Sequence, residues 1–300
     1  MYTDGLLMKA FLLTLVTVCR AASEPTVQSN VVYGMYSGAA LLMDVHRPSA
    51  NPNGYGIVFI SGSGWTTPMA YGSWELKSNG QSTMYTKPLV AAGYTVFTIN
   101  HRALPRFHYP AAVEDAQRAV RFIRHNAAQF GIRPDRIGAS GGSSGGHLVS
   151  MLGTLDGKGK PEDPDPVERE SAKVQCVVAR AAPTNFFRAE SAGVKFLGMS
   201  LVAPVDKASI EYRTYAEGSP VTHISPDDPP FLLMHGDQDE SVPFMQSVDF
   251  ERALKAAGVT VRLLLVDGAG HGPNFPGAKN PPDYMGEMVA WFNRYLVVAH

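Results

Sequence analysis

Cysteine is rare in this chain, and net charge is almost absent. Two cysteines among 300 residues exclude a disulfide-rich scaffold and a cysteine-rich zinc site. Lysine and arginine number 26 and aspartate and glutamate number 27, which leaves a net charge of −1. That balance offers no electrostatic footprint for nucleic acid or for an anionic membrane. The nine histidines show no clustered ligand spacing, so we expect no metal and no other cofactor.

Long apolar runs are also missing beyond the amino terminus, so the sequence predicts no transmembrane span. One short apolar run covers residues 10–19, with Lys9 before it and small residues at 21–23. This arrangement is typical of a secretory signal peptide. We therefore expect residues 1–22 to be a cleaved signal and the protein to be secreted or periplasmic. The alternative is a buried amino-terminal helix. Cleavage would leave Cys176 as the single cysteine, inside an apolar run that predicts its burial.

The rest of the chain alternates between short apolar runs and helical patterns. Apolar residues recur at spacings of three and four over residues 113–130, which predicts an amphipathic helix that Gly131 ends. Strands that alternate with helices indicate crossover units and a mostly parallel, doubly wound sheet. We expect one α/β domain over residues 23–300. The expected strands are 56–60, 94–99, 136–141, 173–179, 231–235 and 260–266, and the expected helices are 83–92, 110–130, a segment from 144 onward, 243–257 and 283–298.

Two segments interrupt this alternation. Residues 156–171 are charged and rich in proline, which predicts an exposed loop. Residues 186–222 carry aromatic side chains without a clean periodicity. The second segment is either a small cap over a pocket or ordinary helical packing.

The strongest motif is the run Gly141-Gly142-Ser143-Ser144-Gly145-Gly146-His147, between an expected strand and an expected helix. Gly-x-Ser-x-Gly at such a junction is typical of a nucleophile elbow, a sharp turn that exposes a serine hydroxyl above the sheet. Both Ser143 and Ser144 fit the pattern, and the motif by itself leaves that choice open. A phosphate-binding loop is disfavoured because no Lys-Ser/Thr pair closes the run.

A serine nucleophile needs a base, and the base needs an acid that orients it. His271 lies in the glycine-rich stretch 268–272, and Asp239 follows the strand 231–235. Because the carboxyl ends of parallel strands meet at one edge of a sheet, we expect both side chains near the serine. Asp237 competes with Asp239 for the role of acid, with a turn cap as its alternative role.

The hydrolytic reaction also needs donors for a developing oxyanion. The expected donors are the amide after the nucleophile, Ser144, and the small-residue loop after the strand 56–60. Gly62, Ser63 and Gly64 are the candidates in that loop. Trp65 closes the loop and is expected to bind substrate in the pocket or to pack beneath it.

These segments resemble the α/β-hydrolase esterases typified by the bacterial bifunctional acetylxylan and feruloyl esterases, which are similar to the hormone-sensitive-lipase-like carboxylesterases. The segments that carry the resemblance are 44–48, 110–127, 135–148, 225–243 and 268–272. The resemblance implies an α/β-hydrolase fold and activity on carboxylic esters. It also implies Ser143 as the nucleophile, Asp239 as the acid and His271 as the base.

The chain departs from that family at two places. The family has His-Gly-Gly-Gly-Trp where this chain has Ser61-Gly62-Ser63-Gly64-Trp65, so the donating loop amide stays open. The family's Asp-Tyr-Arg is here Asn100-His101-Arg102, and we interpret His101 as structural.

The sequence therefore predicts a serine hydrolase that cleaves carboxylic esters through an acyl-enzyme. Its substrate would be a small-molecule or polysaccharide-linked ester, and short acyl, acetyl and feruloyl groups are all compatible. A prolyl-oligopeptidase-like serine peptidase is an alternative, although such proteins normally carry a large additional amino-terminal domain. A catalytically inactive hydrolase-fold binding protein is the other alternative.

Overall fold

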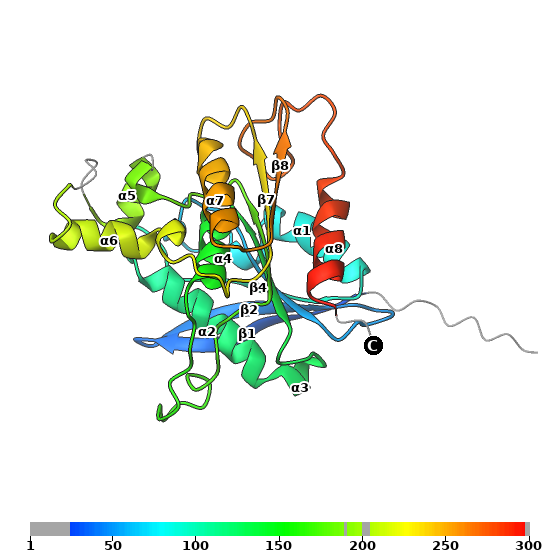
Figure 1. Cartoon of the computed structure of the whole chain (residues 1–300). Helices are drawn as coiled ribbons and strands as arrows, with labels where there is room; N and C mark the ends of the chain where they lie inside the picture. Colours follow the sequence, from blue (N-terminus) through cyan, green and yellow to red (C-terminus); the bar gives the residue numbers. More distant parts are fainter. Residues whose placement is uncertain (1–24, 189–190, 200–204, 298–300) are drawn as a thin grey trace, which may run out of the picture.

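The computed structural model describes residues 25–188, 191–199 and 205–297 (Figure 1). The predicted signal peptide, residues 1–22, lies outside the described residues and stays a prediction. No helix in the described ranges is both long and apolar enough to cross a membrane. Cys176 is a buried free thiol, as its apolar surroundings in the sequence predict.

A single eight-stranded sheet organises the described chain. Its strand order is β1-β2-β4-β3-β5-β6-β7-β8. The strands are β1 (Thr26–Tyr36), β2 (Ala39–Arg47), β3 (Gly56–Ile60), β4 (Thr95–Ile99), β5 (Ile137–Gly142), β6 (Cys176–Arg180), β7 (Phe231–Gly236) and β8 (Val261–Val266). Strands β3 to β8 are parallel, whereas β1 pairs antiparallel with β2, and β2 pairs antiparallel with β4. The predicted mostly parallel sheet is confirmed, and the β1–β2 hairpin is an addition.

Helices cover both faces of this sheet. They are α1 (Gly80–Ala91), α2 (Ala111–His125), α3 (Ala127–Phe130), α4 (Ser144–Thr154), α5 (Ser191–Leu197), α6 (Ile210–Gly218), α7 (Met245–Ala256) and α8 (Tyr284–Tyr295). Buried side chains of α2, α4 and α7 belong to one hydrophobic cluster, and those of α1 and α8 belong to the other. Figure 1 shows the same division on either side of the sheet. The fold is therefore doubly wound, as predicted.

Two helices differ from the predicted boundaries for local reasons. The helix expected over 110–130 divides at Asn126, whose side chain donates to the carbonyl of Phe122. Gly131 ends the second piece with a φ of 67°, a left-handed conformation that glycine adopts without strain. Helix α1 begins three residues early because the Asn79 side chain accepts from the Ser82 amide and caps it there.

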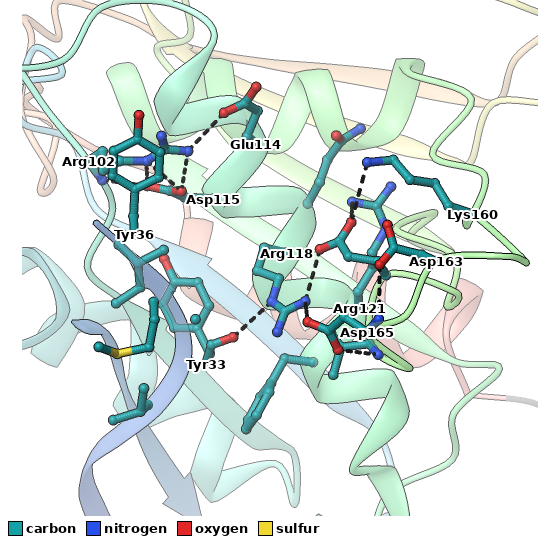
Figure 2. Close-up of a pocket in the computed structure, with 18 residues that line it drawn as sticks. Tyr33, Tyr36, Arg102, Glu114, Asp115, Arg118, Arg121, Lys160, Asp163 and Asp165 are labelled. Atoms are coloured by element: carbon teal, nitrogen blue, oxygen red, sulfur yellow. Dashed lines mark hydrogen bonds and ion pairs between the residues drawn. The ribbon is translucent and has the colours of Figure 1, made fainter. Parts of the chain in front are cut away.

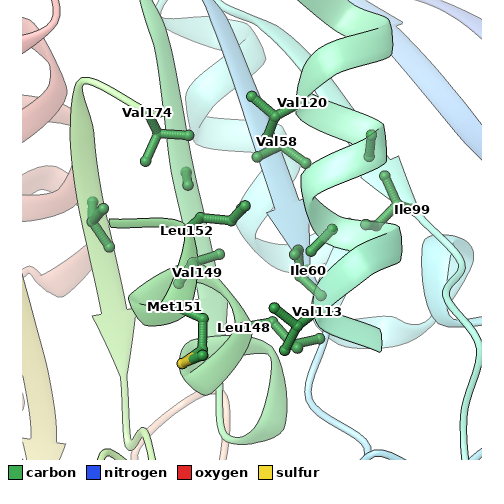
Figure 3. Packing of buried hydrophobic residues seen from close by; sticks show 14 of the residues in the cluster. Val58, Ile60, Ile99, Val113, Val120, Leu148, Val149, Met151, Leu152 and Val174 are labelled. Atoms are coloured by element: carbon green, nitrogen blue, oxygen red, sulfur yellow. The ribbon is translucent and has the colours of Figure 1, made fainter. Parts of the chain in front are cut away.

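Packing in the core fixes helix α4, which begins directly after Ser143. All the residues of α4 are buried. Leu148 and Leu152 of this helix lie in the same cluster as Val58 and Ile60 of β3 and Val120 of α2 (Figure 3). Full burial of such a side chain contributes about 1.5–3 kcal/mol. The amino terminus of α4, where the serine motif lies, is thus held on a rigid support.

The segment 186–222 forms two 3-10 turns, Phe186–Arg188 and Pro220–Thr222, with α5 and α6 between them. It packs beside the predicted active site, since Phe196 stacks on Trp65 with ring centroids 4.7 Å apart. Its role as a cap stays a prediction.

Candidate active site

Ser143 occupies the sharp turn between β5 and α4. Its backbone has a φ of 55° and a ψ of −125°, a conformation that is strained for a residue with a side chain. Two hydrogen bonds hold it: the Ser143 amide donates to the Arg180 carbonyl at 2.8 Å, and the His147 amide donates to the Ser143 carbonyl at 3.0 Å. The turn is therefore fixed from both neighbouring elements, as a nucleophile elbow requires.

Two glycines permit the close approach of backbone around this turn. A Cβ on Gly62 would lie 2.6 Å from the Gly142 carbonyl oxygen and 2.8 Å from the Ser143 Cβ. A Cβ on Gly145 would lie 2.0 Å from the Ile60 carbonyl oxygen. Contacts below 3.0 Å force the structure to shift, so a side chain at either place would separate the loop after β3 from the serine.

The structure brings the predicted serine, histidine and aspartate together from three strand ends. His271 Nε2 lies 3.0 Å from Ser143 Oγ, and His271 Nδ1 lies 2.7 Å from Asp239 Oδ2. Because the carboxylate accepts, Nδ1 carries the proton and Nε2 is left to accept from the serine hydroxyl. This is the hydrogen-bonded geometry of a base that can activate a nucleophile.

Asp239 is held as an anion. The amides of Ser241 and Val242 donate to its Oδ1 at 2.9 and 2.8 Å. Burial acts to raise the pKa of Asp239. Hydrogen bonds from His235, His271 and the Val242 amide outweigh that effect and hold the pKa well below its usual value. Asp239 is therefore a charged counter-ion for His271.

His235, near the carboxyl end of β7, also reaches the acid. Its Nε2 lies 3.2 Å from Asp239 Oδ2 and 2.9 Å from the Val242 carbonyl oxygen, and its Nδ1 lies 2.7 Å from Ser247 Oγ. The side chain is fully buried. Asp237 instead accepts from the Gly268 amide at 2.8 Å, so it holds the turn.

Of the three candidate amides in the oxyanion loop, two already donate hydrogen bonds to protein atoms and the third does not, among the described residues. The Gly62 amide donates to Gln81 Oε1 at 2.5 Å, and the Ser63 amide donates to Ser144 Oγ at 2.8 Å. The Gly64 and Ser144 amides have no acceptor among the described residues. Ser144 Oγ is buried and occupied by Ser63, which distinguishes it from the Ser143 hydroxyl beside His271.

Trp65 both lines the cavity and packs beneath it. Only 2% of the residue is exposed. Its Nε1 donates to His147 Nδ1 at 3.2 Å, and His147 Nε2 lies 2.8 Å from the Gly218 carbonyl oxygen. Burial lowers the pKa of His147 to about 4, so this imidazole is neutral and accepts the indole proton. His147 is therefore a structural link between α4 and the segment 186–222.

The serine opens into a cavity of about 250 Å³. Its wall includes Ser143, His271, Gly64, Trp65 and Val242. This is below the range of roughly 300–1,000 Å³ that is usual for drug-sized ligands. The space is suited to a short group on the carbonyl that Ser143 would attack.

Sequence reasoning missed two buried polar side chains beside the site. Gln246 accepts from the amides of Thr184 and Asn185 at 3.0 and 2.9 Å, and so fixes one wall of the cavity. Arg180 is buried at the end of β6, and its Nη1 donates to the Gly272 carbonyl at 2.7 Å. The sequence signal for Arg180 is one charge directly after the apolar run 176–179. Their partners are far away in the sequence, so no local pattern identifies them.

A separate cavity of about 910 Å³ lies between β1, α2 and the loop 156–171 (Figure 2). Arg102 binds Glu114 at 2.9 Å and Asp115 at 2.8 Å, and Arg118 binds Asp165 at 2.6 Å. These pairs fasten the segment after β4 and the loop 156–171 to α2. The lining shares no residue with the cavity at Ser143. In the part of the chain that the structure describes, no group of three histidine, cysteine or acidic side chains could hold a metal.

Comparisons with known proteins give the family of this chain. Residues 43–254 match the BD-FAE family. The chain is 31% identical over 233 residues to the probable carboxylic ester hydrolase LipM of Mycobacterium tuberculosis, covering 75% of this chain and 51% of LipM. It is 29% identical over 241 residues to the esterase LipQ of the same organism, covering 77% and 53% of the two chains. The chain thus spans about half the length of these curated relatives.

Solved structures resemble the chain over almost its whole length. A truncated carbohydrate esterase from gut microbiota is 26% identical with a TM-score of 0.73, over 90% of this chain and 95% of that one. An acetyl ester-xyloside bifunctional hydrolase from Caldicellulosiruptor lactoaceticus is 25% identical with a TM-score of 0.74, over 89% and 96%. The family match covers more than half of the chain, and the sheet has the strand order described above. The chain belongs to the BD-FAE family and has an α/β-hydrolase fold.

Proposed function

We propose that this protein is a serine hydrolase that cleaves carboxylic esters through an acyl-enzyme. The observation that carries the proposal is the continuous hydrogen-bonded line from Asp239 through His271 to Ser143. The carboxylic ester hydrolases and esterases among its relatives support it. A peptidase or an inactive binding protein has no comparable support.

The reaction follows from the roles of the three side chains. His271 Nε2 takes the proton from the Ser143 hydroxyl as the oxygen attacks the ester carbonyl. The negative oxygen of the tetrahedral intermediate is stabilised by amides, for which Gly64 and Ser144 are the donors without another acceptor. The imidazolium, stabilised by Asp239, then protonates the leaving alcohol. Water repeats the sequence on the acyl-enzyme and releases the acid.

The acyl group that we propose is short, of acetyl size. The small cavity at Ser143 favours it over a long chain. The two structural relatives are a carbohydrate esterase and an acetyl ester-xyloside hydrolase, which supports an acetylated polysaccharide or oligosaccharide as substrate. Such a substrate agrees with the secreted or periplasmic location that we propose from residues 1–22.

The test compares wild type, Ser143→Ala and Ser144→Ala on p-nitrophenyl acetate at neutral pH. We expect Ser143→Ala to lower kcat/KM by about 10⁴ or more, because the nucleophile is gone. Ser144→Ala is the matched control, since it removes only the acceptor of the Ser63 amide. Its kcat/KM should fall by less than about tenfold. Equal activity of Ser143→Ala and wild type would rule out the proposed nucleophile.

A further inference from the structure

Arg180 lies directly beneath the nucleophile turn. Its backbone carbonyl accepts from the Ser143 amide, and its side chain is 3% exposed. A Cβ on Gly142 would lie 2.3 Å from Arg180 Nη2, so the guanidinium packs against the residue that precedes the serine. The variable position of the Gly-x-Ser-x-Gly motif is glycine in this chain, and that choice leaves the room that Arg180 occupies.

The guanidinium has an unusual set of partners. Its Nη1 donates to the Gly272 carbonyl at 2.7 Å, whereas its Nε is buried with no hydrogen-bond partner among the described residues. No carboxylate in the described ranges forms an ion pair with it. Its Cζ lies 5.9 Å from the centre of the Tyr85 ring, within reach of a cation–π contact. A buried cation without an anionic partner is unfavourable for stability, so a hydrophobic side chain would be the better choice for folding alone.

Two buried side chains hold consecutive carbonyls of the loop that carries the histidine. Arg180 binds the carbonyl of Gly272, the residue after His271, and Tyr85 donates to the carbonyl of Pro273 at 2.8 Å. Burial raises the pKa of Tyr85 to about 12, so its hydroxyl keeps the proton that it donates. The loop that positions His271 is thus fixed from β6 and from α1.

We propose that Arg180 is a positioning residue for His271. It fixes the backbone next to the imidazole through its hydrogen bond to the Gly272 carbonyl. The proposal rests on the proposed function, in which His271 is the base. Removal of Arg180 would let the imidazole leave the line between Ser143 and Asp239, which slows the chemical step and leaves substrate binding almost unchanged.

The experiment compares Arg180→Met with Arg121→Met. Arg121 is the matched control because it is also buried and binds backbone carbonyls, of Glu170 and Lys158, on the far cavity shown in Figure 2. For Arg180→Met on p-nitrophenyl acetate, we expect kcat to fall by about tenfold or more, with KM changed less than about threefold. Arg121→Met should change neither kinetic quantity.

Failure of the positioning role and failure of the proposed function give different results. A histidine-selective NMR spectrum reports the surroundings of the His271 imidazole directly and needs no turnover. An unchanged His271 signal and an unchanged kcat in Arg180→Met would overturn the positioning role, as would equal effects of Arg121→Met. Absence of esterase activity in the wild type would overturn the proposed function instead. If Arg180→Met does not fold, Tyr85→Phe removes the second hold on the loop. We then expect a lower kcat with KM almost unchanged, and an unchanged kcat would overturn the proposal.

Discussion

Ser143 keeps a backbone conformation that serine rarely adopts, and the atoms around it explain why. Hydrogen bonds to Arg180 and from His147 hold the turn, and Gly62 lets the oxyanion loop approach it closely. A left-handed conformation of this kind costs roughly 1–3 kcal/mol, which the buried α4 offsets. The close packing of backbone atoms around Ser143 therefore sets the geometry of the site.

A methyl group on Gly62 tests that crowding. In Gly62→Ala the new Cβ would meet the Gly142 carbonyl and the Ser143 Cβ, so the loop must withdraw from the oxyanion position. We expect kcat on p-nitrophenyl acetate to fall by about 10², the usual effect of losing one oxyanion donor. Gly80→Ala is the control, because a Cβ there meets nothing within 4 Å. Full activity of Gly62→Ala would show that the loop approach is not needed.

Helix α4 links the elbow to the rest of the molecule, and His147 is the polar element of that link. Its imidazole joins Trp65 of the oxyanion loop to the Gly218 carbonyl of α6. The sequence places His147 inside the serine motif. Its full burial and its two partners assign it to the scaffold.

The titration of His147 predicts a pH dependence of stability. Burial lowers its pKa to about 4, below the usual value near 6.5. Between these values the unfolded chain binds a proton that the folded chain does not, so stability falls as the pH is lowered. We expect the free energy of unfolding to drop by about 2 kcal/mol more in wild type than in His147→Phe between pH 7.5 and pH 5.

Urea unfolding of both proteins at the two pH values measures this difference. Other histidines with lowered pKa, such as His46 and His101, are present in both proteins and cancel. A gap between wild type and variant that stays constant across the pH range would contradict the assignment of a neutral, buried imidazole.

At the scale of the whole molecule, one sheet brings the three candidate catalytic side chains together. Strands β5, β7 and β8 are parallel, and the serine, aspartate and histidine follow their carboxyl ends. The antiparallel hairpin β1–β2 extends the sheet on the other side, away from these strands. Strand β1 is therefore the edge strand on the side of the sheet opposite β8.

The predicted signal peptide is tested on the whole chain. We expect expression of the full sequence in a secreting host to give an exported protein whose amino terminus lies near residue 23. Mass spectrometry of the purified protein measures that terminus. A protein that keeps residues 1–22 and stays in the cytoplasm would contradict both the cleavage and the proposed location.

The sequence by itself determined the parts of this protein that depend on neighbouring residues. Alternating apolar runs predicted the parallel strands. The serine motif and two later strand ends predicted a serine, an aspartate and His271, and the family resemblance implied Ser143 and Asp239 among the alternatives. Only the tertiary structure decided the contacts between residues that are far apart in the sequence. The Ser63 amide donates to Ser144 Oγ, and Arg180 packs against Gly142 and binds the loop that carries His271. The physical reason is that burial and hydrogen-bond partners of a polar side chain are set by packing between elements, which no local pattern encodes.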